Sequence, residues 1–405
     1  MKFAVASFLI AASIANCSAA DWPQFLGPAR NGISPETGLM KKWPADGPKE
    51  VWRVKGGVGM SGIAVSGGKA LTLLQKDGKQ VLLALDAKTG KTLWETPLAA
   101  EYENQMGNGP RGTPAMSGDQ VFVYTGEGIL VAASLKDGKI LWQHHPVKDF
   151  GGMPSDYGMS CSPLVVGSQV IVSPGAPGAA VAAYDTKSGK LSWKAGDDPA
   201  GYSSPALLKV GGREQIVVFT GASAIGLTPG TGELLWRYPY ETEFNCNIAT
   251  PLAVDGRVFI SCGENHGCVL LDVSGKEPAV VWESQGTKSV FKNEWQTAIQ
   301  FDGHLFGFDN VGSAGPVTHL ACINAADGKP VWQKSRFGKG NLIAADGKLF
   351  LSTMKGELVV LAANSKRYEE LGRKVILDTT RQSPSLSGGL LYLRDDKEIV
   401  CLDVR

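Results

Sequence analysis

The sequence predicts an all-β protein, an eight-bladed β-propeller of four-stranded antiparallel blades, and three observations predict it. A phrase ending in Trp recurs along the chain, a hairpin-like phrase occurs eight times, and the two chain ends carry complementary parts of one blade. Successive Trp residues of the phrase stand 43 to 51 residues apart. That period is typical of propeller blades rather than of short solenoid repeats.

The Trp phrase is represented by LLALDAKTGKTLW at residues 82–94, where an apolar run, an acidic residue and a Gly turn precede the Trp. A Trp ring buries a large apolar surface, and Gly lets a turn approach the ring closely. We therefore predict that each ring packs across to the neighbouring blade, so that these residues are structural rather than catalytic. The predicted docking residues are Trp52, Trp94, Trp142, Trp193, Trp236, Trp282 and Trp332.

The second phrase consists of two short apolar runs joined by a tight turn that usually contains Gly, as in GTPAMSGDQVFVYT from Gly112. Such a pattern predicts a β-hairpin. The Trp phrase adds two further strands, so each unit is a four-stranded antiparallel sheet. The eight copies begin at Ser61, Gly112, Ser160, Ser203, Ile248, Gln296, Asn341 and Gln382.

The chain ends predict how the ring closes. The C-terminal IVCLDVR has an acidic residue in the slot of Asp86 but no Trp after it, whereas PKEVWRV carries Trp52 without a preceding turn phrase. We expect the N-terminal strand to complete the last blade, which leaves no long free edge. One blade is degenerate, because the stretch from Leu358 lacks both the Gly and the Trp.

The N-terminus predicts export. Residues 1–20 resemble a secretory signal peptide, with Lys2, an apolar stretch and a small-residue cleavage site. We expect an N-terminal extension at 21–47 and the propeller at 48–405. Cys17 raises the question of lipid attachment, but Asn16 before it is unlike the small residue of lipoprotein signals, so we expect secretion without lipidation.

Composition excludes several partner classes. Without Lys2 the chain carries equal numbers of basic and acidic residues, and no later stretch is long and apolar enough for a membrane helix. We therefore expect no nucleic-acid partner and no transmembrane segment, and a periplasmic monomer with protein partners in the cell envelope.

Six cysteines follow Cys17, and an oxidising compartment permits disulfides among them. The stretch from Cys262 to Cys268 encloses His266 and has two interpretations: a disulfide across a hairpin, which we favour, or a zinc site. Cys246 would compete for either partner. Cys322 and Cys401 occupy equivalent strand positions and are expected to be buried small hydrophobes.

The connections between blades are longer than the hairpin turns and should gather on one face around the channel mouth. Function often resides on such loops mounted on a rigid scaffold. Trp295 is notable because it lies outside the spacing of the docking Trp residues. In a separate loop, Asp309 and Asn310 would offer oxygen atoms to Ca²⁺. The candidate binding residues are Arg111, Asp156, Tyr157, Tyr202, Asn245, Glu264, His266, Trp295 and Arg381.

These repeats resemble the quinoprotein-type propeller family, whose A-x-D-x-x-T-G-x-x-x-W motif is matched by Ala84, Asp86, Thr89, Gly90 and Trp94. The opening DWPQFLGPARNG is similar to W-P-x-F-R-G-P openings of secreted bacterial members, with Leu26 where Arg is usual. One branch of the family comprises dehydrogenases that hold pyrroloquinoline quinone (PQQ) and Ca²⁺ over the central funnel. Another resembles BamB, the non-catalytic propeller subunit of the outer-membrane β-barrel assembly machinery.

The motifs favour the BamB-like branch. Two features that the resemblance leads one to expect in a dehydrogenase, a Cys-Cys pair and a C-x-x-C-H haem site, do not occur in the sequence. We therefore expect a binding or scaffold propeller of the cell envelope with no catalytic residue, no metal and no cofactor. A PQQ- and Ca²⁺-dependent alcohol or sugar dehydrogenase is the alternative, and an envelope glycan-binding protein, suggested by loop Tyr and Trp residues, is a further one.

Overall fold

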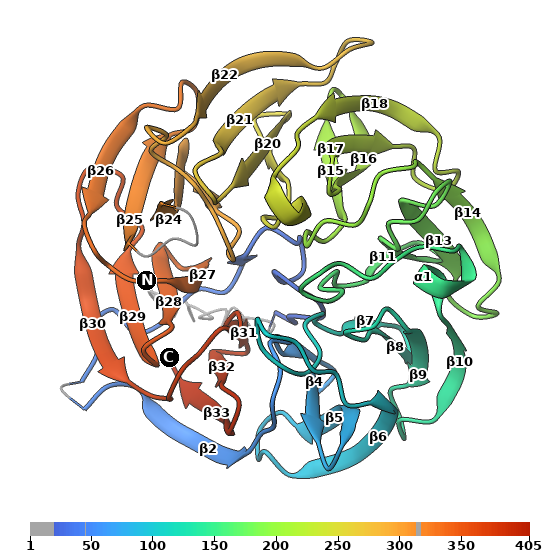
Figure 1. Cartoon of the computed structure of the whole chain (residues 1–405). Helices are drawn as coiled ribbons and strands as arrows, with labels where there is room; N and C mark the ends of the chain where they lie inside the picture. The colour runs from blue at the N-terminus through green and yellow to red at the C-terminus, as the bar shows by residue number, and fades with distance from the viewer. Residues whose placement is uncertain (1–19, 45, 313–316) are drawn as a thin grey trace, which may run out of the picture.

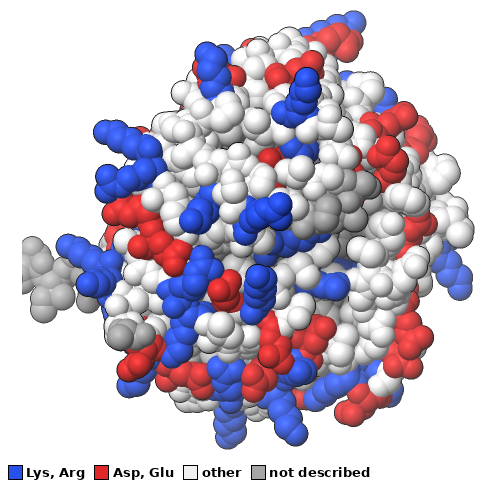
Figure 2. Space-filling model, turned by 60° about the vertical axis from the view of Figure 1, so that its left-hand side comes forward, with Lys and Arg blue, Asp and Glu red and all other residues white. Residues whose placement is uncertain are grey.

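A computed structural model describes residues 20–44, 46–312 and 317–405, and it confirms the eight-bladed propeller (Figure 1). The predicted signal peptide and Cys17 lie outside the described residues, apart from Ala20. No helix in the described part of the chain is long and apolar enough to cross a membrane. Lys and Arg alternate with Asp and Glu over the side of the molecule that Figure 2 shows, so that this side carries no large area of one charge.

Each blade is a four-stranded antiparallel sheet whose first strand lies nearest the channel. The first four blades comprise β3 (Ala64–Ser66), β4 (Lys69–Lys76), β5 (Lys79–Asp86) and β6 (Thr92–Ala100); β7 (Ala115–Ser117), β8 (Gln120–Tyr124), β9 (Leu130–Ser134) and β10 (Ile140–His144); β11 (Leu164–Val166), β12 (Gln169–Val172), β13 (Val181–Asp185) and β14 (Leu191–Ala195); and β15 (Ala206–Val210), β16 (Arg213–Phe219), β17 (Ser223–Leu227) and β18 (Leu234–Pro239).

The remaining blades follow in chain order. They comprise β19 (Leu252–Val254), β20 (Arg257–Cys262), β21 (Gly267–Asp272) and β22 (Ala279–Gln285); β23 (Ile299–Phe301), β24 (His304–Val311), β25 (Val317–Asn324) and β26 (Pro330–Lys334); β27 (Gly340–Ala345), β28 (Lys348–Thr353), β29 (Glu357–Ala362) and β30 (Glu370–Val375); and β31 (Ser385–Ser387), β32 (Leu390–Arg394), β33 (Glu398–Asp403) and β2 (Lys49–Lys55). Two short helices, α1 (Pro146–Asp149) and η1 (Glu243–Asn245), lie in connections between blades.

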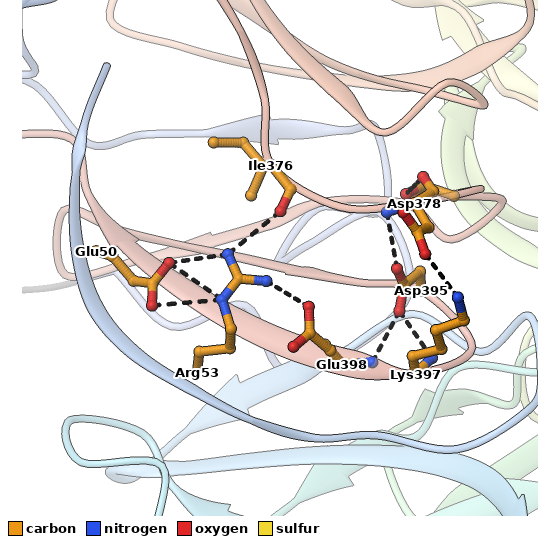
Figure 3. A network of polar contacts seen from close by, with 8 residues as sticks. Glu50, Arg53, Ile376, Asp378, Asp395, Lys397 and Glu398 are labelled. Atoms are coloured by element: carbon orange, nitrogen blue, oxygen red, sulfur yellow. Dashed lines mark hydrogen bonds and ion pairs between the residues drawn. The ribbon is translucent and has the colours of Figure 1, made fainter. Parts of the chain in front are cut away.

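The ring closes as predicted, because β2 pairs antiparallel with β33 and becomes the outer strand of the eighth blade. Arg53 on β2 forms ion pairs with Glu50 and with Glu398 of β33, at 2.8 and 2.5 Å, and donates to the carbonyl of Ile376 beyond β30 (Figure 3). Exposed ion pairs of this kind each contribute less than about 1 kcal/mol. Strand pairing and burial therefore provide most of the closure.

Five of the seven predicted docking rings lie against the turn glycine of the next blade: Trp52, Trp94, Trp142, Trp193 and Trp282. A Cβ atom added to Gly90 would come within 2.7 Å of the Trp52 ring, and one added to Gly232 within 2.3 Å of the Trp193 ring. The Trp52 indole N–H also donates to the carbonyl of Ala87 in the first blade, at 3.0 Å. Glycine at these turns thus allows a ring-to-backbone contact that any side chain would obstruct.

The seventh blade lacks its Trp and receives one from elsewhere. Val360 pairs with Gly372 at the position where Cys322 pairs with Trp332 in the sixth blade. Trp43, in the N-terminal extension, covers Gly372 so closely that an added Cβ would lie 2.9 Å from its ring. Because Trp43 is buried in the cluster shared by the seventh, eighth and first blades, it fills the gap that the missing blade residue would leave.

The N-terminal extension crosses the channel and closes one end of it (Figure 1). Trp22 forms a two-way backbone bridge with Val65 of the first blade, and strand β1 (Ile33–Ser34) adds parallel to β27 of the seventh. On the eighth blade, the Glu36 carboxylate accepts hydrogen bonds from the backbone N–H groups of Gly388 and Gly389, at 2.5 and 2.6 Å. Across the ring, Arg30 donates to the backbone carbonyls of Ser162 and Pro163 just before the third blade, so the extension acts as a floor attached to blades on both sides of the ring.

Candidate functional site

The channel above this floor contains a cavity of about 170 Å³. One equivalent residue from each blade lies around it, two positions before the inner strand or, in the seventh blade, at the second position of that strand. Most of these residues carry a hydroxyl group. The ring consists of Gly62, Thr113, Ser162, Ser204, Thr250, Thr297, Asn341 and Ser383. We call these eight residues the axial ring.

Hydrogen bonds join neighbouring members of the axial ring. The backbone N–H of Gly62 donates to the hydroxyl of Thr113, that of Thr113 to Ser162, and that of Ser162 to Ser204, at 2.9–3.0 Å. Thr250 donates to Thr297 in the same way, at 3.0 Å. Each of these hydroxyl oxygens accepts a backbone N–H from the preceding blade. The hydroxyl hydrogen is not used in that bond and can be donated to another acceptor.

Aromatic and cationic side chains form one wall of the cavity. Trp295 lies between two cations: the Lys339 ammonium is 4.5 Å and the Arg381 guanidinium carbon 5.6 Å from the centre of its ring system. Lys339 also forms an ion pair with the buried Glu294 at 2.8 Å, and burial raises the pKa of that carboxyl. Trp295 therefore presents an electron-rich ring that two cations hold in place.

A pair of stacked tyrosines forms the opposite wall. Tyr157 and Tyr202 have ring centres 5.7 Å apart, and the backbone N–H of Tyr157 donates to the Tyr202 hydroxyl at 3.2 Å. Burial raises the pKa of both phenols, which therefore remain protonated at neutral pH. Phe244 packs beside Tyr157, yet 62% of its surface is exposed and its backbone is left-handed, with φ of 57°.

Arg111 shapes the rim. Its guanidinium donates to the carbonyls of Tyr157, Gly107 and Gly109 and lies over the Tyr102 ring at 4.6 Å. Burial lowers the pKa of Arg111, and the neighbouring positive charge of Arg381 acts in the same direction. Arg111 thus holds two inter-blade loops together while leaving its charge unpaired with any carboxylate of the described residues.

The structure brings together five of the nine predicted binding residues, since Arg111, Tyr157, Tyr202, Trp295 and Arg381 all line the cavity.

The other four lie away from the cavity lining. Asp156 is an exposed loop residue, and Asn245 lies in η1 with φ of 54°. Glu264 occupies the β20–β21 turn, while His266 approaches Glu243 at 2.7 Å.

The predicted disulfide is not formed. Cys262 pairs in register with Gly267, whereas Cys268 pairs with Ser261, so the two thiols point to opposite faces of the sheet. Each is buried in a different core cluster. All six cysteines of the described part are free and buried, and there no three His, Cys, Asp or Glu side chains are grouped to hold a metal. The zinc alternative therefore has no support either.

The calcium possibility at Asp309 is also contradicted. The Asp309 carboxylate lies in β24, buried against the Lys292 ammonium at 2.7 Å. Asn310 uses its side chain on the Lys292 carbonyl and the Thr318 hydroxyl. Because an ammonium group already neutralises the carboxylate, a cation would have to displace a buried ion pair.

Two contributions to the site lie in parts of the sequence not selected as candidates. The axial ring is signalled by a recurring Ser or Thr just before the inner strand, often followed by Pro. Phe25 of the N-terminal extension also lines the cavity, and nothing in its local sequence indicates that it reaches the channel.

Comparisons with known proteins match the whole architecture. A family model described as outer membrane protein assembly factor BamB matches residues 43–155, 79–334 and 250–405. The quinohemoprotein alcohol dehydrogenase ADH IIB of Pseudomonas putida is 31% identical over 137 residues, which are 31% of this chain and only 19% of that enzyme.

Solved structures show the same fold at low identity. The quinohemoprotein alcohol dehydrogenase of Comamonas testosteroni superimposes with a TM-score of 0.72 at 14% identity, covering 96% of this chain and 81% of that one. BamB of Moraxella catarrhalis superimposes with a TM-score of 0.60, also at 14% identity, covering 87% and 96% of the two chains.

Proposed function

The chain belongs to the family of the outer membrane protein assembly factor BamB, and from that membership we propose that it is a non-catalytic binding propeller of the bacterial cell envelope. Its partner is a protein that engages the loops around the mouth of the funnel. One observation carries the proposal: five side chains from five different inter-blade connections converge on one cavity. Aromatic and arginine side chains of this kind are the ones that dominate binding energy at protein interfaces.

The chemistry of the cavity favours recognition over catalysis. Proton transfer at neutral pH needs a group such as His or a carboxylate in contact with the substrate. No Asp, Glu, His or Cys side chain of the described residues lines the cavity. The nearby Glu294 is buried in its ion pair with Lys339.

The proposal is tested by capturing envelope partners with the purified protein. We expect components of the outer-membrane β-barrel assembly machinery to be recovered, and a Trp295→Ala variant to recover them poorly. Leu191→Ala is the matched control, because Leu191 is exposed on the outer strand β14, away from the mouth. Failure of the wild-type protein to recover any such component, or equal recovery by Trp295→Ala, would refute the proposal.

A PQQ-dependent dehydrogenase is a second candidate, supported by the similarity to quinohemoprotein alcohol dehydrogenases. The residues fit this cofactor only in part. Trp295 and Arg381 suit a flat anion, but the lining offers no carboxylate to bind Ca²⁺ and none to act as a base. Stabilisation against heat by PQQ with Ca²⁺, together with dye-linked alcohol oxidation, would favour this candidate over the first.

A further inference from the structure

We propose that the closed funnel binds a carboxylate carried on a small apolar or aromatic body, such as a free aromatic acid or the C-terminus of a peptide ending in Phe. This inference rests on the proposed function and names the chemistry that its cavity recognises. Three groups of residues carry it: arginines without carboxylate partners, hydroxyl donors of the axial ring, and an apolar lining closed by the N-terminal extension.

The positive charge around the cavity is not balanced. Arg111 and Arg381 lie close together in its wall, and Arg30 of the extension donates to the backbone carbonyls of Ser162 and Pro163 at the axial ring. None of these three arginines forms an ion pair with a carboxylate of the described residues. Arg53, in contrast, has two acidic partners. A buried charge without a counter-ion is costly, so an anion in the cavity would be stabilised strongly.

Arg30 is the most deeply buried of the three. Only 2% of its surface is exposed, and its Nε has no hydrogen-bond partner in the described structure. Burial lowers the pKa of Arg30 to about 10, which still leaves it charged at neutral pH. A fixed positive charge therefore lies against the axial ring at the Ser162 carbonyl, behind the residues that line the cavity.

The axial ring supplies neutral donors. Thr113, Ser162, Ser204 and Thr297 are each at least 96% buried and line the cavity, and each hydroxyl oxygen already accepts a backbone N–H. Their O–H groups make no hydrogen bond to an acceptor among the described residues. Hydroxyl groups held in this way are available to donate to a carboxylate in the channel.

The remaining lining is apolar, and its size limits the ligand. Its apolar members include Phe25, Met60, Met106, Ile248 and Trp295. A cavity of about 150 Å³ holds benzene in other proteins, so a cavity of about 170 Å³ suits one ring or one branched side chain beside the carboxylate. Because the extension lies across the far end of the channel and places Phe25 in the lining, we expect a ligand to enter through the loop-lined mouth.

Calorimetric titration with phenylacetate, and with phenylacetamide as its uncharged match, tests the inference. We expect phenylacetate to bind at least about tenfold more tightly than the amide, and Arg381→Gln to lower its affinity about tenfold because a charge-assisted hydrogen bond is lost. Arg53→Gln serves as the matched arginine control and should bind as the wild type does. Equal binding of acid and amide, or an Arg381→Gln variant with unchanged affinity, would overturn the proposal.

A tripeptide ending in Phe, with a free or an amidated C-terminus, distinguishes the two sources of the carboxylate. Tight binding of the free-acid peptide assigns the site to a protein terminus, whereas binding of phenylacetate alone assigns it to a small acid. If Trp295→Ala abolishes capture of assembly components but no acid binds, this inference fails and the proposed function stands. If acids bind and no component is captured, the proposed function fails instead.

Discussion

Replacing Trp193 with alanine removes a ring that joins the third and fourth blades. The Trp193 side chain is 8% exposed, covers Gly232 of the next blade, and donates its indole N–H to the Gln169 side chain at 3.0 Å. Truncation of a large buried aromatic residue costs about 3–5 kcal/mol. With a urea m-value of about 3 kcal/mol/M, the unfolding midpoint should fall by about 1–1.7 M.

A second substitution tests the ring-to-glycine contact itself. Gly232 has φ of 72°, so alanine there costs about 1 kcal/mol in the backbone, and its Cβ would lie 2.3 Å from the Trp193 ring. That overlap adds about 1–3 kcal/mol, which gives about 2–4 kcal/mol in total. In the Trp193→Ala background the overlap is absent, so Gly232→Ala should then cost only about 1 kcal/mol.

Urea unfolding followed by tryptophan fluorescence and circular dichroism measures all four proteins of this cycle. Leu191→Ala, on the same strand but 46% exposed, should change stability by less than about 0.5 kcal/mol. If the effects of Trp193→Ala and Gly232→Ala were simply additive, the ring and the glycine would not be the contact that docks the blades. A Trp193→Ala protein with unchanged stability would refute the structural role of the repeated Trp altogether.

Three further predictions concern other parts of the molecule. Trp43→Ala should destabilise the fold by about 3–5 kcal/mol, as loss of a blade Trp would, although Trp43 lies outside the repeats; thermal and urea unfolding measure this. The Thr89 hydroxyl lowers the pKa of the Asp86 carboxyl, so the ionised carboxylate stabilises the fold above about pH 4 and this contribution is lost as the pH falls through the folded pKa. Asp86→Asn should therefore weaken the fall in unfolding free energy between pH 6 and pH 2.5. Alkylation of the unfolded protein without reductant should modify all six described cysteines, and Cys262→Ser combined with Cys268→Ser should not increase sensitivity to reductant; mass spectrometry and unfolding in dithiothreitol check these outcomes.

The fold could be predicted because its information is repeated. Every copy of the Trp phrase encodes the same local geometry, so an irregular copy does not obscure the period. Trp43 could not be predicted in this way, because it lies outside the repeats. It packs on the seventh blade from a distant part of the chain and lacks the Gly turn that precedes the other docking Trp residues. Contacts between remote segments leave no pattern of spacing in one sequence.

The site was predicted in part. Loop length correctly indicated the face that holds Trp295 and Arg381, but loop membership does not reveal which side chains turn inward. Asp156 and His266 lie on loops too, yet away from the cavity. The predicted disulfide between Cys262 and Cys268 was wrong for a different reason. In the hairpin Cys262 lies opposite Gly267, one residue before Cys268, so the Cys268 side chain points to the other face of the sheet.

The dependence of the last blades on the N-terminal segment has a consequence for how the protein is made. Arg53 and its partner Glu398 are 345 residues apart, so β2 and Trp43 leave the ribosome long before the strands that receive them. Until then an unpaired strand edge and an uncovered indole remain exposed, a state that favours aggregation. A chain that stops short of β33 leaves the edge of β2 unpaired, even though the Gly372 backbone that Trp43 covers has already been made. Closure of the ring therefore comes late in synthesis, because β2 can pair only once β33 has been made.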